Sequence, residues 1–498
     1  MKASLHYALI AMLCIAGIQL NAQTFTWGDA LPSLNEVENT STNLVDAKFY
    51  RIYSKYTMSM FNRDVKVTPF ALNTLKPGET IDLTEQSPKP GKGALGHLSM
   101  YQVNGPDYVV FLDDYDSKSK LNQLYTLTVN IDTGVKSTPV VVTDMPGRSS
   151  TYDIQQSPNK QFYAVIKSHS RDKKVNEKIN IVLLDKNFKL IKETTYSTQY
   201  LNKLPGLDTF CVSDNGSVYI VKEIDIAKQK PFKTLLFWDG KSDTMTETSL
   251  KFDNDYQIYA FKGHFSGNDF YLHGLYTRIG SKGVQMYGGS VPAAGVYAAK
   301  FTATGEKAYI EANDTGEIPG LHLKDFVFDG MKTWLFADNL FTFKNHKPTP
   351  PGGTPSSEYD YSYSNDQIVF GKIDNETGKL EWHKKIAYDE AKTLNDNGTY
   401  LSYLYFLKDN QLSILYNDTQ KTKVDGRNID ERFTVMEIFD DRGNPVSKTF
   451  LADTGLEPQS YHENFDLDTS VQTVVKDGVY IVRAKSRNGN EKYGYFKF

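Results

Sequence analysis

Short hydrophobic stretches, separated by tight polar turns, recur along almost the whole chain. Seven of these turns lead directly into a second hydrophobic stretch, from Asn104-Gly-Pro-Asp before YVVFL to Lys476-Asp-Gly before VYIVRA. Gly and Asn adopt positive φ at little cost, so such turns suit β-hairpins. No long amphipathic helix is predicted between the hairpins. The pattern therefore predicts an all-β protein built from repeated hairpins.

A second hairpin follows in six of the seven units, as in VNIDTGVKSTP and KIDNETGKLEW. Each full unit then has four strands, which is the size of one β-propeller blade. The seven predicted units cover 97–143, 151–196, 208–252, 256–312, 322–386, 400–451 and 465–498. We predict a seven-bladed β-propeller, with six or eight blades as open possibilities and tandem β-sandwiches as the alternative fold.

The last unit has only three strands before the chain reaches Phe498. Two stretches near the start, AKFYRIYSKYTMSMF and RDVKVTPFAL, precede the first full unit and have no assigned place. We expect one of them to complete the last blade, because closing the ring satisfies exposed strand edges. The predicted organisation is a signal peptide at 1–22, an N-terminal extension at 23–45 and one propeller domain at 46–498.

On these repeats, residues 46–498 resemble the broad class of exported bacterial β-propellers. The resemblance rests on the strand and turn pattern, without a regularly recurring WD dipeptide, a kelch double-glycine repeat or an Asp-box array. It implies a fold and leaves the function open.

The first 22 residues have the features of a signal peptide. Lys2 is followed by an apolar run at 8–18, too short to cross a bilayer, and Ala22 supplies a small residue for cleavage. We expect export to the periplasm, the outer envelope or the medium, with no transmembrane segment. Only Cys211 remains after cleavage, and we interpret it as a buried structural thiol.

The formal net charge of −4 and the absence of a basic stripe argue against a nucleic-acid partner. The 13% aromatic content fits a strand-rich protein, because Tyr and Phe favour strands.

The connections between the second and third strands are long in three neighbouring units, and they are predicted to share one face of the ring. Long loops on a rigid scaffold commonly carry binding sites. Tyrosines in these loops could contact a sugar or a peptide, or could instead pack on the blade beneath. The ligand-binding candidates in the loops are Tyr287, Tyr359, Asp360, Tyr361 and Tyr363.

Acidic residues and histidines precede or begin the innermost strands, on the same predicted face. They are Asp153, Asp208, His322, Asp325, His462, Asp466 and Asp468, of which His322, Asp325 and His462 join the binding candidates. Converging carboxylates could bind Ca²⁺ or act as acid and base, but Asp is also common in turns. We therefore predict no cofactor, with Ca²⁺ as a minor possibility.

No catalytic motif such as H-E-x-x-H or G-x-S-x-G is present. We predict a non-catalytic exported binding protein that recognises a protein or a glycan through its long-loop face. The alternative is a polysaccharide hydrolase or lyase with acid and base residues near the mouth of the central channel. A purely structural envelope component is a third possibility.

Overall fold

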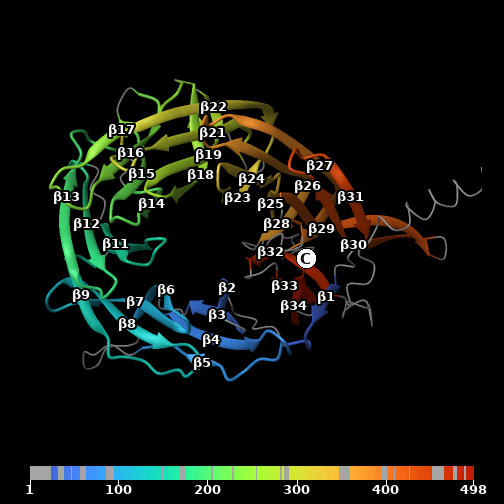
Figure 1. Cartoon of the computed structure of the whole chain (residues 1–498), viewed down its shortest axis with the longest axis horizontal. Helices are drawn as coiled ribbons and strands as arrows, with labels where there is room; N and C mark the ends of the chain where they lie inside the picture. Colours follow the sequence, from blue (N-terminus) through green and yellow to red (C-terminus); the bar gives the residue numbers. More distant parts are fainter. Residues whose placement is uncertain are drawn as a thin grey trace, which may run out of the picture.

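The computed structural model confirms an all-β propeller and corrects the number of blades from seven to eight. Figure 1 shows the blades arranged around one axis. The structure describes residues 24–31, 39–45, 48–56, 63–85, 95–148, 150–168, 174–203, 206–226, 229–253, 255–280, 283–284, 291–346, 359–394, 401–408, 410–424, 427–450, 465–474, 479–486 and 490–497. Separate sheets around a ring exclude the tandem β-sandwich.

The first four blades follow the chain from the inside of the ring to the outside, one strand after another. Blade 1 contains β2 (Asn39–Val45), β3 (Lys48–Tyr56), β4 (Arg63–Ala71) and β5 (Ile81–Asp82). Blade 2 contains β6 (Gly96–Asn104), β7 (Asp107–Asp116), β8 (Leu121–Asn130) and β9 (Val140–Pro146). Blade 3 contains β10 (Thr151–Gln156), β11 (Phe162–Ser168), β12 (Lys178–Asp185) and β13 (Leu190–Ser197). Blade 4 contains β14 (Thr209–Val212), β15 (Val218–Ile224), β16 (Phe232–Trp238) and β17 (Thr246–Ser249).

The remaining blades follow the same plan, with additions in blades 5 and 6. Blade 5 contains β18 (Tyr256–Ser266), β19 (Asp269–Gly280), β21 (Ala293–Phe301) and β22 (Lys307–Ile318), with β20 (Gly283–Val284) beside β19. Blade 6 contains β23 (His322–Asp329), β24 (Lys332–Asp338), β26 (Tyr359–Asp374) and β27 (Leu380–Leu394), with β25 (Phe341–His346) beside β26. Blade 7 contains β28 (Tyr403–Lys408), β29 (Gln411–Val424), β30 (Arg427–Phe439) and β31 (Pro445–Phe450). Blade 8 contains β32 (Phe465–Val474), β33 (Val479–Ser486), β34 (Glu491–Lys497) and β1 (Thr24–Trp27).

The seven predicted units correspond to blades 2 to 8, and the stretches expected to be spare form the additional blade. They become β3 and β4, which pair with each other and with β2 and β5 on their outer sides. Neither strand is therefore available to complete blade 8. That role belongs to β1, which pairs with β34 from Thr24↔Lys497 to Trp27↔Gly494. Residues 23–45, expected to precede the propeller, thus supply strands β1 and β2 to two blades.

The hydrophobic core is divided among the junctions between blades. Among the described residues, one cluster of buried side chains lies in each of the eight junctions, from blades 1 and 2 around to blades 8 and 1. The second and third strands of a blade contact neighbouring blades on both faces, which explains runs such as Val218–Ile224 that are almost entirely buried. The outermost strands face solvent on one side, so β13 alternates between exposed and more buried residues from Ile191 to Ser197.

Buried charges cross the junction of blades 8 and 1, where the ring closes. Arg483 on β33 donates through Nε to Asp468 Oδ2 on β32 at 2.6 Å, and its Nη1 lies 3.7 Å from Glu491 Oε2 on β34. Glu491 also pairs with Arg51 on β3 of blade 1. All four side chains are almost completely buried. Polar pairing and the β1–β34 ladder therefore act together at the closure.

Candidate functional site

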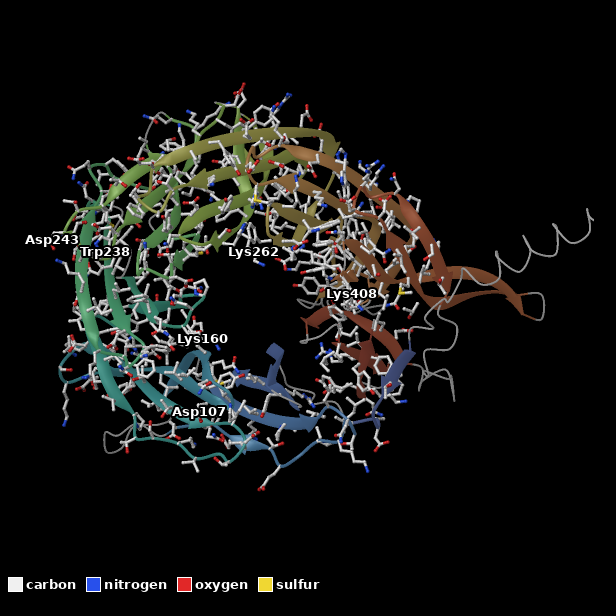
Figure 2. The ribbon with its side chains drawn as sticks, in the orientation of Figure 1. Asp107, Lys160, Trp238, Asp243, Lys262 and Lys408 are labelled. Carbon is white, nitrogen blue, oxygen red and sulfur yellow. The ribbon has the colours of Figure 1, made fainter. Side chains whose placement is uncertain are left out.

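Polar side chains on the innermost strands of blades 5, 6 and 7 form hydrogen bonds from one blade to the next. Lys262 on β18 donates to Asp325 Oδ1 on β23 at 2.5 Å, and Tyr405 on β28 donates through its hydroxyl to Asp325 Oδ2 at 2.6 Å. We call these three residues the inner arc. Figure 2 shows Lys262 at the inner edge of the ring. Both oxygens of the predicted candidate Asp325 are thus held by fixed donors.

A β-bulge next to Asp325 directs Lys324 away from its own blade. The pairing of β23 with β24 shifts between Leu323 and Asp325, so Lys324 is left out of the ladder. Bulges of this kind change the direction of a side chain. Lys324 Nζ donates to Ser402 Oγ at 2.9 Å, to Thr469 O at 2.8 Å and to Tyr403 O. One lysine of blade 6 therefore connects blades 7 and 8.

Burial lowers the pKa of Lys324 to about 8, although the carboxylates of Asp338, Asp468 and Asp325 oppose the shift. A pKa of about 8 leaves the ammonium form dominant at neutral pH. Three acceptors match the three N–H donors of an ammonium group. The local geometry is that of a tether between blades.

Ser402 connects this lysine to a buried carboxylate at the end of β24. Its hydroxyl donates to Asp338 Oδ2 at 2.6 Å, while Lys324 donates to the same hydroxyl oxygen. The serine hydroxyl therefore bridges the ammonium group of Lys324 and the carboxylate of Asp338. His322 Nδ1 lies 3.9 Å from Asp338 Oδ1, and its side chain is 67% exposed. His322 is therefore the solvent-accessible neighbour of the buried Asp338.

The predicted acids converge only in part. Asp325, Asp468 and His322 do gather around Lys324, and Asp468 is buried against Arg483. Asp466 lies half-buried on β32. Asp208 instead pairs with Lys233 at 2.9 Å in blade 4.

Asp153 lies on β10 of blade 3, where burial raises the pKa of its carboxyl. Tyr287 and His462 lie outside the described residues. Within the described ranges, no three His, Cys, Asp or Glu side chains are grouped so that they could hold a metal ion.

The tyrosine-rich loop predicted from the sequence lies in blade 6, where it is instead a strand within a small sheet. β25 pairs with β26 from Phe341↔Ser364 to His346↔Tyr359, and β27 pairs with the other edge of β26 as far as Ser362↔Leu394. We call β25 together with residues 359–365 of β26 and 391–394 of β27 the apron. The apron extends blade 6 past the end of the β23–β24 pairing. That pairing ends where His322 lies opposite Asp338. The alternation of aromatic and polar residues in YDYSY is the period of a strand, and it explains why this segment pairs.

The apron exposes an aromatic ring on each face. Tyr361 is 38% exposed, and Lys344 Nζ lies 5.9 Å from the centre of its ring. Phe343 is 43% exposed and stacks on Phe341 at a centroid distance of 6.3 Å. Tyr363 is buried against Leu401 and Leu340, as the packing alternative expected.

Two other predicted binding candidates lie in the apron: Asp360 is half-buried, and Tyr359 is the first residue of β26.

Sequence reasoning missed Lys324, Asp338, Ser402 and Tyr405. Their residue types occur in many strands and turns, so composition offers no signal for them. A weak signal is the polar pair Lys324-Asp325, which interrupts the alternation of HLKDFVFD where the bulge lies. The contacts with Ser402 and Thr469 span 78 and 145 residues, and no local pattern reveals them.

Cys211 on β14 behaves as predicted for a structural thiol. Its Sγ lies 3.9 Å from Gly263 O, and burial raises the pKa of the thiol to about 12. A thiol with so high a pKa is a poor nucleophile near neutrality.

Neither a protein-family model nor a curated protein sequence matches this chain. Several solved structures resemble this chain at low identity and low TM-score. The β-propeller domain of the Trilobed protease from Pyrococcus furiosus is 10% identical with a TM-score of 0.34, and the alignment covers 84% of this chain and 97% of that one. The acylaminoacyl peptidase of Pyrococcus horikoshii is 9% identical with a TM-score of 0.36, over 90% of this chain and 57% of that one.

The apocarotenoid oxygenase of Synechocystis is 10% identical with a TM-score of 0.31, over 71% and 74% of the two chains. Likeness of this extent concerns the fold, and one propeller fold serves many functions. In the described part of the chain, no helix is long and apolar enough to span a membrane.

Proposed function

We propose that this protein is an exported, non-catalytic binding protein that recognises its partner through the apron and the inner arc. A glycan is the favoured partner, with a protein as the other outcome of the test. The observation that carries the proposal is the apron, a paired sheet that holds exposed rings of Phe343 and Tyr361 in fixed positions. Flat rings with hydroxyl neighbours such as Thr342 and Ser362 suit the apolar faces and hydroxyls of sugars.

The electrostatics of the inner arc also favour binding over acid–base chemistry. Asp325 is fixed by Lys262 and Tyr405, and Asp468 is fixed by Arg483. Burial and the Asp325 charge raise the pKa of Tyr405 far above neutrality, which keeps its hydroxyl protonated as a donor. A hydroxyl that stays protonated serves recognition better than proton transfer, which needs a pKa near the working pH.

Affinity gel electrophoresis with amylose, xylan and polygalacturonate tests the proposal. We expect retardation by at least one polysaccharide, and the double variant Phe343→Ala/Tyr361→Ala should weaken the affinity by about 10-fold or more, as for aromatic hot spots. The control Leu190→Ala/Ile191→Ala removes exposed apolar side chains from the rim of blade 3 and should leave the affinity unchanged. Equal losses in both variants would contradict an apron site.

Release of new reducing ends from a bound polysaccharide would show that the non-catalytic part is wrong. If no polysaccharide binds, the same apron variants are compared in cross-linking with envelope proteins, which decides between a glycan and a protein partner.

A further inference from the structure

Two histidines lie side by side on the face of blade 5 that meets blade 6. In the pairing of β18 with β19, His264 lies opposite Tyr271 and Lys262 lies opposite His273, so these four side chains share one face. The two imidazole rings stack at a centroid distance of 5.2 Å with 14° between their planes. Lys262 of the inner arc is therefore a direct neighbour of the histidine pair.

Aromatic rings of blade 6 cover the pair from the opposite side. Phe328 lies 4.7 Å from the His264 ring, and Phe326 lies 5.7 Å from the His273 ring. His273 is completely buried, and none of the four ring nitrogens has a hydrogen-bond partner. An imidazolium formed in this junction would have two N–H donors on each ring and no acceptor for them.

The charged groups facing the pair do not offset such an imidazolium. Lys262 shares the face and adds positive charge, whereas Asp325 of β23 is already engaged by Lys262 and by Tyr405. Lys300 lies over the Tyr271 ring and pairs with Asp269 at 3.0 Å. Burial lowers the pKa of His264 to about 4 and that of His273 further below its usual range.

We propose that the junction of blades 5 and 6 opens on mild acidification, and that this opening releases the ligand bound at the inner arc. The first part stands on the histidine pair alone, and the second rests on the proposed function. The link between them is direct, because Lys262 and the histidines leave β23 together, which separates Lys262 from Asp325.

The open form is favoured at lower pH because it binds protons that the closed form excludes. The closed form holds the histidines neutral, whereas in the open form their pKa returns to about 6.5. Protons therefore bind the open form preferentially as the pH falls below about 6.5, and the preference stops growing only below the closed-form pKa of about 4. Between about pH 7 and pH 5, His264 alone raises the opening equilibrium about 20-fold, and both histidines together raise it several hundred-fold at most, roughly, by the same linkage.

Hydrogen exchange of the full-length protein at about pH 7 and pH 5, corrected for the chemical exchange rate, tests the opening. Peptides from β18, β19 and β23 should gain at least about 10-fold in opening at the lower pH, while β10 to β12 of blade 3 stay unchanged. The variant His264→Phe/His273→Phe should remove the gain, and His264→Gln should reduce it. The matched control His383→Phe changes a half-buried histidine elsewhere and should leave the gain in place.

The proposal is overturned if opening of β18, β19 and β23 in the wild-type protein increases no more than that of blade 3 between about pH 7 and pH 5. Retention by the three polysaccharides at both pH values tests the release. Binding at about pH 7 that persists at about pH 5 despite opening overturns the release alone. Absence of binding at both pH values overturns the glycan form of the proposed function and the release of these probes, while the exchange result still decides the opening.

Discussion

The junction of blades 8 and 1 and the junction of blades 5 and 6 bury polar groups in opposite ways. At the first, Arg483, Asp468, Glu491 and Arg51 are charged and paired with one another. At the second, His264 and His273 stay neutral, without hydrogen-bond partners for their ring nitrogens. Buried charges are tolerated when they are paired, and buried bases are tolerated when they give up their proton. The second solution responds to small changes of pH, because an exposed imidazole gains its proton near pH 6.5.

The largest effect should come from breaking the charged junction. Arg483→Met leaves Asp468 buried without its main partner, and losses of about 3–5 kcal/mol are usual when one member of a buried pair is removed. Urea unfolding measures this loss. Lys485→Met is the control, since Lys485 is 32% exposed and 3.6 Å from Asp468, and should cost less than about 1 kcal/mol. Similar losses in the two variants would show that Arg483 is not the essential partner.

Lys324 extends the comparison to a buried base that keeps its proton near neutrality. Its pKa is lowered to about 8 in the folded protein, so folding is penalised below that pH and the penalty disappears as the pH rises towards the unfolded value of about 10.4. Between about pH 8 and pH 10, the free energy of unfolding should rise by about 2 kcal/mol relative to Lys324→Met. Urea unfolding of both proteins at each pH gives this difference, and a constant difference would contradict the lowered pKa.

Strand β1 tests whether backbone pairing at the closure matters as well as charge. A methyl group at Gly494 would lie 2.6 Å from Trp27 Cε3 and 2.9 Å from Thr26 O, so Gly494→Ala should push β1 away from β34. We expect a cost of about 1–3 kcal/mol, as for other overpacked sites, with faster hydrogen exchange in β1. Gly267→Ala, where the methyl meets nothing within 4 Å, should leave exchange in β1 unchanged.

The smallest effect should come from a polar contact at the outer rim. Tyr196 on β13 and Tyr200 both donate to Glu247 on β17, at 2.5 and 2.6 Å, and so connect blades 3 and 4. These contacts are exposed, so Tyr200→Phe should cost only about 0.5–1 kcal/mol in urea unfolding. A loss as large as that of Arg483→Met would mean that burial does not decide how much a polar contact between blades contributes to the free energy of unfolding.

The candidate site shows the limit of reading a sequence without its fold. The pattern brought Asp325 and His322 to attention because both begin an inner strand, and the structure places them beside Lys324. It could not reveal Lys324 itself, because a bulge decides where this side chain points. Tyr361 and Tyr363 were noticed as aromatic residues, but the pairing of β25 with β26 exposes one and buries the other.

The sequence by itself determined the strands with strong local signals. Period-two alternation and turns rich in Asn, Asp and Gly are local properties, so the hairpins of blades 2 to 8 were visible without any partner. Blade 1 was missed because its flanking strands are weak: β2 is the polar sequence NTSTNLV, and β5 has two residues. Its central strands β3 and β4 therefore looked unpaired.

Only the tertiary structure decided which strand closes the ring and which polar groups meet. Strand β1 has four residues, too few for a periodic signal, and it pairs with a strand more than 460 residues away. The junctions between blades are likewise contacts between distant segments, as in the pairing of Arg51 with Glu491. A local pattern records how one strand buries its own face, whereas the pairing of two distant segments depends on how the whole ring closes.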